Sequence, residues 1–304
     1  MYSKVRIGPA GVHIFDRSTG LNILVDEVKT NESAWSLAPR HVSIALTNAC
    51  ELSCPYCYAP KRPASLDFHL LASWLKELDE NGCLGVGFGG GEPTLYGQFP
   101  EICGFATENT NLAVTFTTHG HNLDERLLAK LCGKVHFLRI SMDGVNSTYE
   151  ALRRRPFSRL LDRIRLVREL APFGINYVVN KRTITDLDHA ISIADNLGAS
   201  EFLLLPEEPV NSRGGIDDRT LEKLREWIEC YSGRIPLTIS EASASGINAT
   251  NPFADETGLR GFAHIDAWGI LKRTSYDAEG QPIGPSGVIK ALSLLSKQRG
   301  DDRK

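Results

Sequence analysis

The sequence has no long apolar run, no marked excess of charge and few cysteines. None of its apolar stretches approaches the roughly 18 consecutive residues that a membrane-spanning helix needs. Its 37 acidic and 34 basic residues give a net charge of −3, which provides no general attraction for nucleic acid or anionic membranes. We therefore expect neither a nucleic-acid partner nor a membrane partner.

The cysteines are few, and their number is odd. The amino terminus lacks the apolar stretch of a secretory signal peptide, so we expect a cytoplasmic protein with reduced thiols. An odd total of seven cysteines in a reducing compartment argues against a disulfide framework. Three of them, Cys50, Cys54 and Cys57, fall within eight residues, and this close trio needs a chemical explanation.

From residue 41 onward, the sequence alternates between strand patterns and helix patterns. Six such units in succession predict an α/β fold with a parallel sheet and right-handed crossovers, either barrel-like or doubly wound. In both arrangements, ligands bind at the carboxyl ends of the strands. The expected strands are His41–Thr47, Leu84–Gly89, Ala113–Thr117, His136–Ser141, Ile175–Asn180 and Glu201–Leu205. The expected helices are Ser65–Glu80 (capped by Ser65), Leu123–Leu131, Phe157–Leu170, Leu187–Leu197 and Leu221–Tyr231.

The two ends of the chain differ from this central region, which covers residues 41–233. In residues 1–40, two strand patterns at Val12–Phe15 and Leu21–Val25 predict an N-terminal β-hairpin. Residues 234–304 predict a small α+β extension. It contains one more strand at Ile235–Ser240, a hairpin at Phe262–Thr274 and a helix near Ser286–Leu295.

The cysteine trio lies in the loop after the first expected strand, and thiolates at its spacing can converge on one soft metal centre. A cubane cluster has four irons, so three cysteines leave one iron free for a small molecule to chelate. Structural zinc would need a fourth ligand, and no cysteine or histidine lies at a suitable short spacing. The sequence therefore favours an iron–sulfur cluster over zinc.

Three motifs together resemble the radical S-adenosylmethionine (SAM) superfamily. The first is Cys-x3-Cys-x2-Cys with Tyr56 before the last cysteine. The second, Gly89-Gly-Gly-Glu-Pro-Thr94, resembles the superfamily's glycine–glycine–glutamate motif. The third, Ser141-Met-Asp-Gly144, resembles a serine–x–aspartate–glycine motif of peptide-modifying members, the SPASM/twitch-type branch. The matches span residues 41 to about 210, and they imply a partial (β/α)6 barrel of the TIM type.

The resemblance also implies the cofactors and their ligands. One [4Fe–4S] cluster would be held by the cysteine trio, and its open iron would bind SAM. Glu92 would meet the methionine ammonium, and Arg153 the SAM carboxylate, with Arg154 and Arg155 as competing candidates. Tyr56 would lie against the adenine, and Ser141 and Asp143 would meet the ribose or the methionine end. The implied SAM contacts are Tyr56, Gly90, Gly91, Glu92, Ser141, Asp143 and Arg153.

The third expected strand ends in Thr117-Thr-His-Gly-His121, where related enzymes often have threonine–asparagine–glycine. His119 thus stands in place of asparagine. Both side chains donate hydrogen bonds, but only histidine titrates near neutral pH. His119 is a candidate contact for SAM or substrate, and a partly exposed loop histidine is the alternative.

The implied chemistry is reductive cleavage of SAM, with an electron from a flavodoxin or ferredoxin, to a 5′-deoxyadenosyl radical that abstracts hydrogen from a substrate. A ribosomally made peptide is the leading substrate, by crosslinking or epimerisation. The alternatives are a small metabolite, or a non-catalytic Fe–S or zinc protein. The C-terminal extension resembles that of the peptide-modifying members but lacks their cysteines: after residue 132 only Cys230 remains. We therefore expect a single cluster per chain.

Substrate candidates lie at the carboxyl ends of the later strands. Cys230 is a further candidate, as a hydrogen donor to a substrate radical, although its helical position places it toward the outside of its helix. His264 and Trp268 on the C-terminal hairpin are expected either to close over the mouth or to pack. The strand-end candidates are Asn180, Lys181, Glu207, Glu208 and Glu241.

Overall fold

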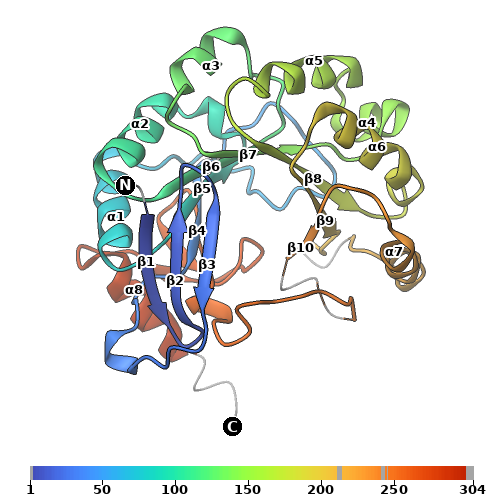
Figure 1. Cartoon of the computed structure of the whole chain (residues 1–304). Helices are drawn as coiled ribbons and strands as arrows, with labels where there is room; N and C mark the ends of the chain where they lie inside the picture. Colours follow the sequence, from blue (N-terminus) through green and yellow to red (C-terminus); the bar gives the residue numbers. More distant parts are fainter. Residues whose placement is uncertain (1–2, 211–213, 241–243, 245, 299–304) are drawn as a thin grey trace.

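The computed structural model describes residues 3–210, 214–240, 244 and 246–298. Within them, ten strands form one sheet in the order β10-β9-β8-β7-β6-β5-β4-β11-β12-β13 (Figure 1). From β4 to β10 all neighbours are parallel, and each new strand is added on the same side. A doubly wound sheet reverses direction partway, so the barrel-like alternative is confirmed. The parallel strands are β4 (His41–Thr47), β5 (Gly85–Gly90), β6 (Ala113–Thr118), β7 (Phe137–Ser141), β8 (Phe173–Val179), β9 (Glu201–Pro206) and β10 (Leu237–Ile239).

Helices cover the outer side of this curved sheet (Figure 1). Their apolar faces and the outward side chains of the strands form the main core, whose fully buried members include Trp74, Phe88 and Phe202. The helices are α1 (Phe68–Glu80), α2 (Phe99–Asn109), α3 (Glu125–Leu131), α4 (Asn146–Arg153), α5 (Phe157–Val167), α6 (Leu187–Leu197) and α7 (Asp218–Cys230). The structure is thus an α/β partial barrel, as predicted.

The predicted N-terminal hairpin is incomplete, because residues 3–25 form a three-stranded antiparallel sheet. Its strands are β1 (Ser3–Gly8), β2 (Gly11–Asp16) and β3 (Leu21–Val25). The buried Arg6 points inward and donates to the carbonyl oxygens of Ala38, Gly82 and Arg260 at 2.8, 3.0 and 3.1 Å. These carbonyls immediately precede β4, β5 and β11, so the small sheet covers the amino ends of the barrel strands.

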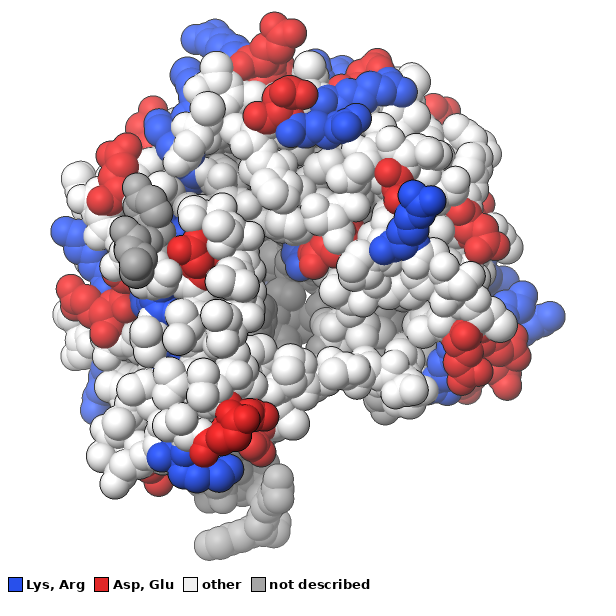
Figure 2. Space-filling view, viewed as in Figure 1, with Lys and Arg blue, Asp and Glu red and all other residues white. Residues whose placement is uncertain are grey.

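The outer face of the small sheet is apolar. Val5, Ile14 and Ile23 lie side by side across its three strands, and Val5 and Ile23 are 55% and 44% exposed. In β1 the polarity is thus reversed: Lys4 and Arg6 point inward, and Val5 points outward. On the face that Figure 2 shows, viewed as in Figure 1, charged side chains of both signs are scattered and neither sign forms a large patch.

The C-terminal segment extends the barrel sheet at β4. β11 (Phe262–Ile265) pairs with β4 in parallel, and β12 (Ile270–Lys272) and β13 (Gln281–Pro282) follow in antiparallel order. The predicted hairpin is thus confirmed, with its turn between β11 and β12. α8 (Gly287–Lys297) packs on α1, and the Glu77 carboxylate accepts two backbone N–H groups at its start, from Val288 and Ile289. Among the described residues, no helix is both long and apolar enough to span a bilayer.

Candidate cluster and SAM site

The cysteine trio occupies a loop that leaves the carboxyl end of β4 and returns beside it. The backbone N–H of Asn48 donates to the Ala64 carbonyl at 3.0 Å, and its side-chain amide donates to the Arg62 carbonyl at 3.0 Å. Within the loop, the N–H of Cys57 donates to the carbonyl of Cys54 at 3.2 Å. Local hydrogen bonds therefore hold the loop at the mouth of the barrel.

Each of the three thiols is half-buried, unpaired and approached by an N–H donor. The Leu52 N–H lies 3.4 Å from Cys50 Sγ, Arg153 Nη1 3.5 Å from Cys54 Sγ, and Lys61 Nζ 3.6 Å from Cys57 Sγ. N–H donors of this kind stabilise negative charge on sulfur ligands of a cluster.

Burial raises the pKa of Cys50 to about 11, and burial likewise raises the pKa of Cys54. At neutral pH these thiols are therefore protonated until a metal supplies the positive charge that favours thiolate. Two sulfurs on one zinc ion can be at most about 4.6 Å apart. In the part of the chain that the structure describes, the metal-ligand group that meets a comparable limit of 4.8 Å is Cys50, Glu51 and His119, without Cys54 or Cys57. The three sulfurs are thus not all close enough to share one ion, whereas a [4Fe–4S] cluster gives each cysteine an iron of its own.

The last glycine of β5 and the glycine that follows it allow this strand to approach the start of the cysteine loop closely. Gly90 has a φ of +122°, and a Cβ on Gly91 would lie 2.3 Å from the Ala49 carbonyl oxygen. The N–H groups of Gly91 and Glu92 donate to the carbonyls of Thr47 and Ala49 at 2.7 and 2.8 Å. Gly90 and Gly91 were predicted to bring backbone close to SAM. In the structure, the contact that they permit is with the chain between β4 and Cys50.

Glu92 is 1% exposed, and its carboxylate is held firmly. Oε1 accepts from the N–H and hydroxyl of Thr94 at 3.2 and 2.7 Å and from the Thr118 hydroxyl at 2.8 Å. Oε2 accepts from the backbone N–H of His119 at 3.0 Å. The carboxylate therefore has one defined orientation beside the cysteine loop.

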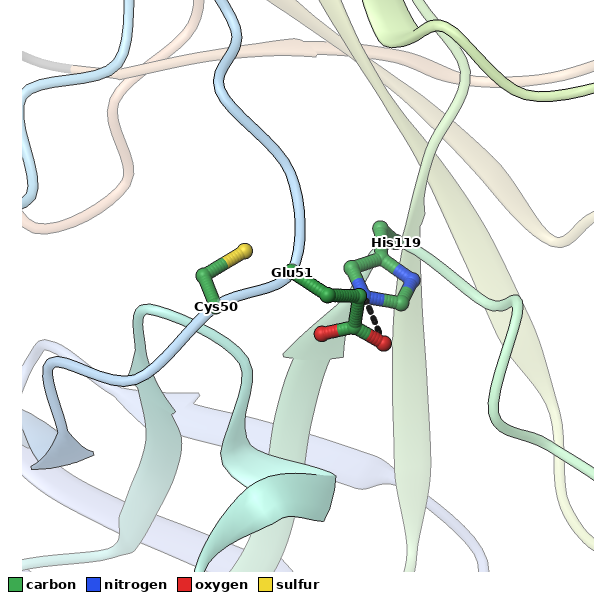
Figure 3. Close-up of side chains that lie close together, drawn as sticks. All are labelled: Cys50, Glu51 and His119. Atoms are coloured by element: carbon green, nitrogen blue, oxygen red, sulfur yellow. Dashed lines mark ion pairs between the residues drawn. The ribbon is translucent and has the colours of Figure 1, made fainter.

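His119 is 4% exposed, so the alternative of a partly exposed loop histidine is wrong. Its Nε2 lies 3.3 Å from Glu51 Oε1 and 3.4 Å from Glu92 Oε2. Figure 3 shows Cys50 and Glu51 on the cysteine loop and the His119 ring facing the Glu51 carboxylate. His119 therefore joins the loop to the carboxyl ends of β5 and β6.

Asp143, after the end of β7, is the centre of a second buried network. Its Oδ2 accepts from the Tyr56 hydroxyl at 2.7 Å and forms an ion pair with Arg153, while Oδ1 accepts from the Val178 N–H at 2.7 Å. Burial, followed by the charge of Asp143, raises the pKa of Tyr56, so its hydroxyl remains a donor. Ser141 is half-buried at the end of β7.

The three candidate arginines differ in their contacts and exposure in the structure. Arg153 contacts both Asp143 and Cys54. Arg154 is exposed, and Arg155 donates to the Arg154 carbonyl at 3.3 Å. Of the three, Arg153 is the one that the structure places at the cysteine loop.

The substrate candidates are more dispersed. Glu207 accepts from the Asn180 side-chain amide at 2.8 Å and from the Gly215 N–H at 3.2 Å, so it connects the carboxyl ends of β8 and β9. Lys181 is exposed and Glu208 half-buried. Cys230 is exposed at the last position of α7, as its helical position predicts. Glu241 lies outside the described residues.

The two candidates on the C-terminal hairpin differ. His264 is buried, with Nδ1 3.2 Å from the Ser43 hydroxyl, so it packs against β4. Trp268 in the turn is 46% exposed and contributes to a cavity of about 330 Å³ that α1 and the preceding loop also line.

Sequence reasoning missed Glu51. Its position next to Cys50 makes it part of the loop, but its contact with His119 spans 68 positions of the chain and depends on how the loop folds. One feature of the sequence could have indicated this contact. His119 stands where related enzymes often have asparagine, and its ring has a second nitrogen that can reach the cysteine loop.

Comparison with known proteins agrees with this geometry. Residues 44–193 match the family model described as the radical SAM superfamily. The chain is 28% identical over 234 residues to the mycofactocin maturase MftC of Mycolicibacterium smegmatis, covering 71% of this chain and 58% of the relative. It is 29% identical over 206 residues to the AdoMet-dependent heme synthase of Methanosarcina barkeri, covering 64% and 59%.

A third relative, the PqqA peptide cyclase of Granulibacter bethesdensis, is 29% identical over 171 residues, covering 53% of this chain and 46% of the relative. The chain thus spans about half of the length of these curated relatives. Among solved structures, Streptococcus suis SuiB bound to the precursor peptide SuiA superposes with a TM-score of 0.76 at 15% identity, covering 98% of this chain and 87% of SuiB. A structure of anSMEcpe with bound AdoMet gives a TM-score of 0.66 at 18% identity, covering 86% and 82%. These two likenesses show the shared fold. The matched family model, together with the three sequence motifs at one mouth of the barrel, places residues 44–193 in the radical SAM superfamily.

Proposed function

We propose that this protein is a radical SAM enzyme that abstracts hydrogen from a ribosomally made peptide, leading to a crosslink or an epimerised residue. The observation that carries the proposal is the cysteine loop: three free, half-buried thiols, each approached by an N–H donor, beside the buried carboxylates of Glu92 and Asp143. When bound, the cluster and SAM supply a 5′-deoxyadenosyl radical.

The chain's own residues have two tasks at this site. Cys50, Cys54 and Cys57 hold the cluster, and Arg153 fixes the loop by joining Cys54 to the buried Asp143. Glu92, oriented by Thr94, Thr118 and the His119 N–H, presents a carboxylate to the SAM ammonium. Burial of these groups excludes water from the reacting centre.

A peptide substrate is supported by two of the named relatives. One curated relative is a PqqA peptide cyclase, and SuiB was solved with a precursor peptide. A small metabolite is the second candidate, supported by the similarity to an AdoMet-dependent heme synthase. A short precursor-peptide gene beside this one would favour the peptide.

We further propose one cluster per chain, a flavodoxin or ferredoxin as reductant, and a cytoplasmic location. Beyond the cysteine trio, Cys83 and Cys103 are buried in the core, while Cys132 and Cys230 are exposed and lie far apart in the sequence. A second cluster needs several cysteines together. Lys61 places positive charge beside Cys57, where an acidic reductant would approach.

The test is anaerobic reconstitution with iron, sulfide, SAM and reductant, followed by measurement of 5′-deoxyadenosine. We expect about four irons per chain and 5′-deoxyadenosine in the wild type. Cys54→Ala should lose both the cluster absorption and SAM cleavage, whereas Cys132→Ala, an exposed cysteine, should keep both. A fully loaded wild-type protein that forms no 5′-deoxyadenosine would contradict the proposal, and about eight specifically bound irons would contradict the single cluster.

A further inference from the structure

The buried His119 ring carries an N–H group without a hydrogen-bond partner. The backbone N–H of His121 donates to His119 Nδ1 at 3.1 Å, so Nδ1 is an acceptor without a proton. The proton of a neutral imidazole then sits on Nε2. Only 3% of this side chain is exposed, yet Nε2 forms no hydrogen bond to any described residue.

Two carboxylates lie close to this N–H without satisfying it. Glu51 Oε1 and Glu92 Oε2 are 3.3 and 3.4 Å from Nε2, but neither distance comes with a hydrogen-bonding angle. An unsatisfied buried donor costs about 1–3 kcal/mol. A donor in such a position is aimed at a group that arrives with a ligand.

A single metal ion is not that ligand. The ligand atoms of Cys50, Glu51 and His119 lie within 4.8 Å of one another, which suggests a mononuclear site at first sight. A metal-bound histidine nitrogen needs a free lone pair, and here the contact from His121 places the proton on Nε2. The ring is therefore a hydrogen-bond donor in this arrangement.

Glu92 supplies the complementary acceptor. Its Oε1 already accepts three hydrogen bonds, from Thr94 and Thr118. Its Oε2 accepts one, from the His119 backbone, and a carboxylate oxygen has about two acceptor sites. One free acceptor and one free donor thus stand 3.4 Å apart, both buried and both beside the cysteine loop.

An adjacent acceptor and donor match the two charged groups of an α-amino acid. Its ammonium donates hydrogen bonds, and its carboxylate accepts them. The family resemblance already gives the SAM ammonium to Glu92. We propose that His119 Nε2–H donates to the neighbouring carboxylate at the methionine end of SAM, a contact that the resemblance gives to Arg153, which is paired here with Asp143. This inference rests on the proposed function in that SAM is the ligand.

Glu51 has a separate part in this arrangement. It is 31% exposed, and its Oε1 also accepts from the Asn122 side-chain amide at 2.6 Å. It can therefore turn toward solvent when a second carboxylate arrives, which leaves the His119 N–H to SAM. Asparagine, which related enzymes often have at this position, also offers an N–H donor.

The experiment measures binding to the cluster-loaded protein by calorimetry, with SAM and with decarboxylated SAM, which lacks the carboxylate. His119→Phe should weaken SAM binding about 10- to 100-fold, the effect of losing a hydrogen bond to a charged group. It should leave the affinity for decarboxylated SAM within about threefold. His119→Asn should restore most of the SAM affinity. Cluster content and circular dichroism check each variant, and His119→Leu replaces His119→Phe if the larger ring prevents loading.

The outcomes are distinct. An equal loss for both ligands, or no loss for either, would overturn the inference, because the effect would not depend on the carboxylate. If the wild type binds and cleaves SAM under those results, the proposed function stands and the inference alone fails. If the loaded wild type does not bind SAM at all, both fail.

Discussion

Asp143 connects three parts of the site through one carboxylate. It is fully buried and holds Tyr56 from the cysteine loop, Arg153 from the end of α4 and the Val178 N–H from β8. A buried ion pair adds little net stability, but removal of one partner leaves an uncompensated charge in the interior. Asp143 therefore positions Arg153, and through it Cys54.

Asp143→Asn should destabilise the cluster-free protein by about 3–5 kcal/mol, because Arg153 stays charged and buried without its partner. Urea unfolding measures the change in free energy. Arg154→Ala, at the neighbouring exposed arginine, is the control and should change it by less than about 0.5 kcal/mol. A small effect of Asp143→Asn would show that water reaches Arg153.

His264 should make stability depend on pH. Burial lowers its pKa to about 4, from 6.5. Below pH 6.5 His264 is protonated in the unfolded chain, but in the folded chain it stays neutral until about pH 4. The free energy of unfolding therefore falls as the pH decreases through this range. The shift corresponds to roughly 3 kcal/mol.

The measurement for His264 is urea unfolding at pH 7 and pH 4.5 for the wild type and for His264→Gln. The variant should lose less stability between the two pH values than the wild type, because it has no histidine to protonate at this position. An equal loss in both proteins would mean that His264 is protonated in the folded state.

At the scale of elements, close backbone contact places the cysteine loop. Gly91 lies against the carbonyl oxygens of Asn48 and Ala49, and an added Cβ would lie 2.6 and 2.3 Å from them. At Gly89, two residues earlier, an added Cβ would have no heavy atom of the described residues within 4 Å, apart from its own chain neighbours. The two glycines of one motif therefore differ in what they can tolerate.

Gly91→Ala should displace the start of the cysteine loop and reduce the cluster content after reconstitution severalfold. Gly89→Ala should load normally, since its Cβ meets open space. Iron and sulfide analysis, together with the visible absorption of the cluster, measures the cluster content of both variants. Equal loading of the two variants would show that the loop can shift without losing the cluster.

The sequence was a good guide to elements with strong apolar periodicity and a poor guide to others. α6 was predicted to the residue, because its apolar positions recur at helical spacing. α2 and α4 were missed. In the case of α4 the reason is that the helix is short and polar and buries only Tyr149 and Leu152. α1 begins after Asp67, whose carboxylate accepts from the Leu70 N–H, and not after Ser65, which forms a β-bridge with Thr47.

The residues of the site fall into the same two groups, those that the sequence predicted and those that it did not. The cysteine trio, Glu92 and Asp143 were recognisable because each belongs to a local motif. The Glu51–His119 contact and the separation of Arg153 from its neighbours depend on how distant segments meet, which local patterns do not encode. β1 was missed because its inward side chains are charged, the reverse of an ordinary half-buried strand.

At the scale of the whole molecule, hydrogen bonds of the buried Arg6 attach the small sheet to the barrel. Arg6 is 2% exposed and serves three carbonyls and Glu256. Glu256 also pairs with Arg40, so it keeps one partner without Arg6. The Arg260 carbonyl likewise keeps the Arg40 N–H at 2.9 Å, so the carbonyls of Ala38 and Gly82 are the two that depend on Arg6.

Arg6→Met should therefore lower the free energy of unfolding by about 2 kcal/mol, roughly 1 kcal/mol for each of the Ala38 and Gly82 carbonyls, which lose the guanidinium donor. Arg6→Lys should recover little, because an ammonium lacks the planar fork that reaches several acceptors. Lys29→Met, at an exposed position near the same sheet, is the control and should have little effect. Full stability in Arg6→Met would mean that water replaces the guanidinium.

The contacts of Arg6 and β4 also bear on when the protein can fold during synthesis. Arg6 meets Glu256 and Arg260 across 250 and 254 positions of the chain, and β4 gains its outer neighbour only with β11. The ribosome must therefore release residue 265 from its exit tunnel before the edge beside the cysteine loop is closed. Until then β4 exposes one unpaired edge, which is open to pairing with other chains for longer than in a protein whose early strands pair locally.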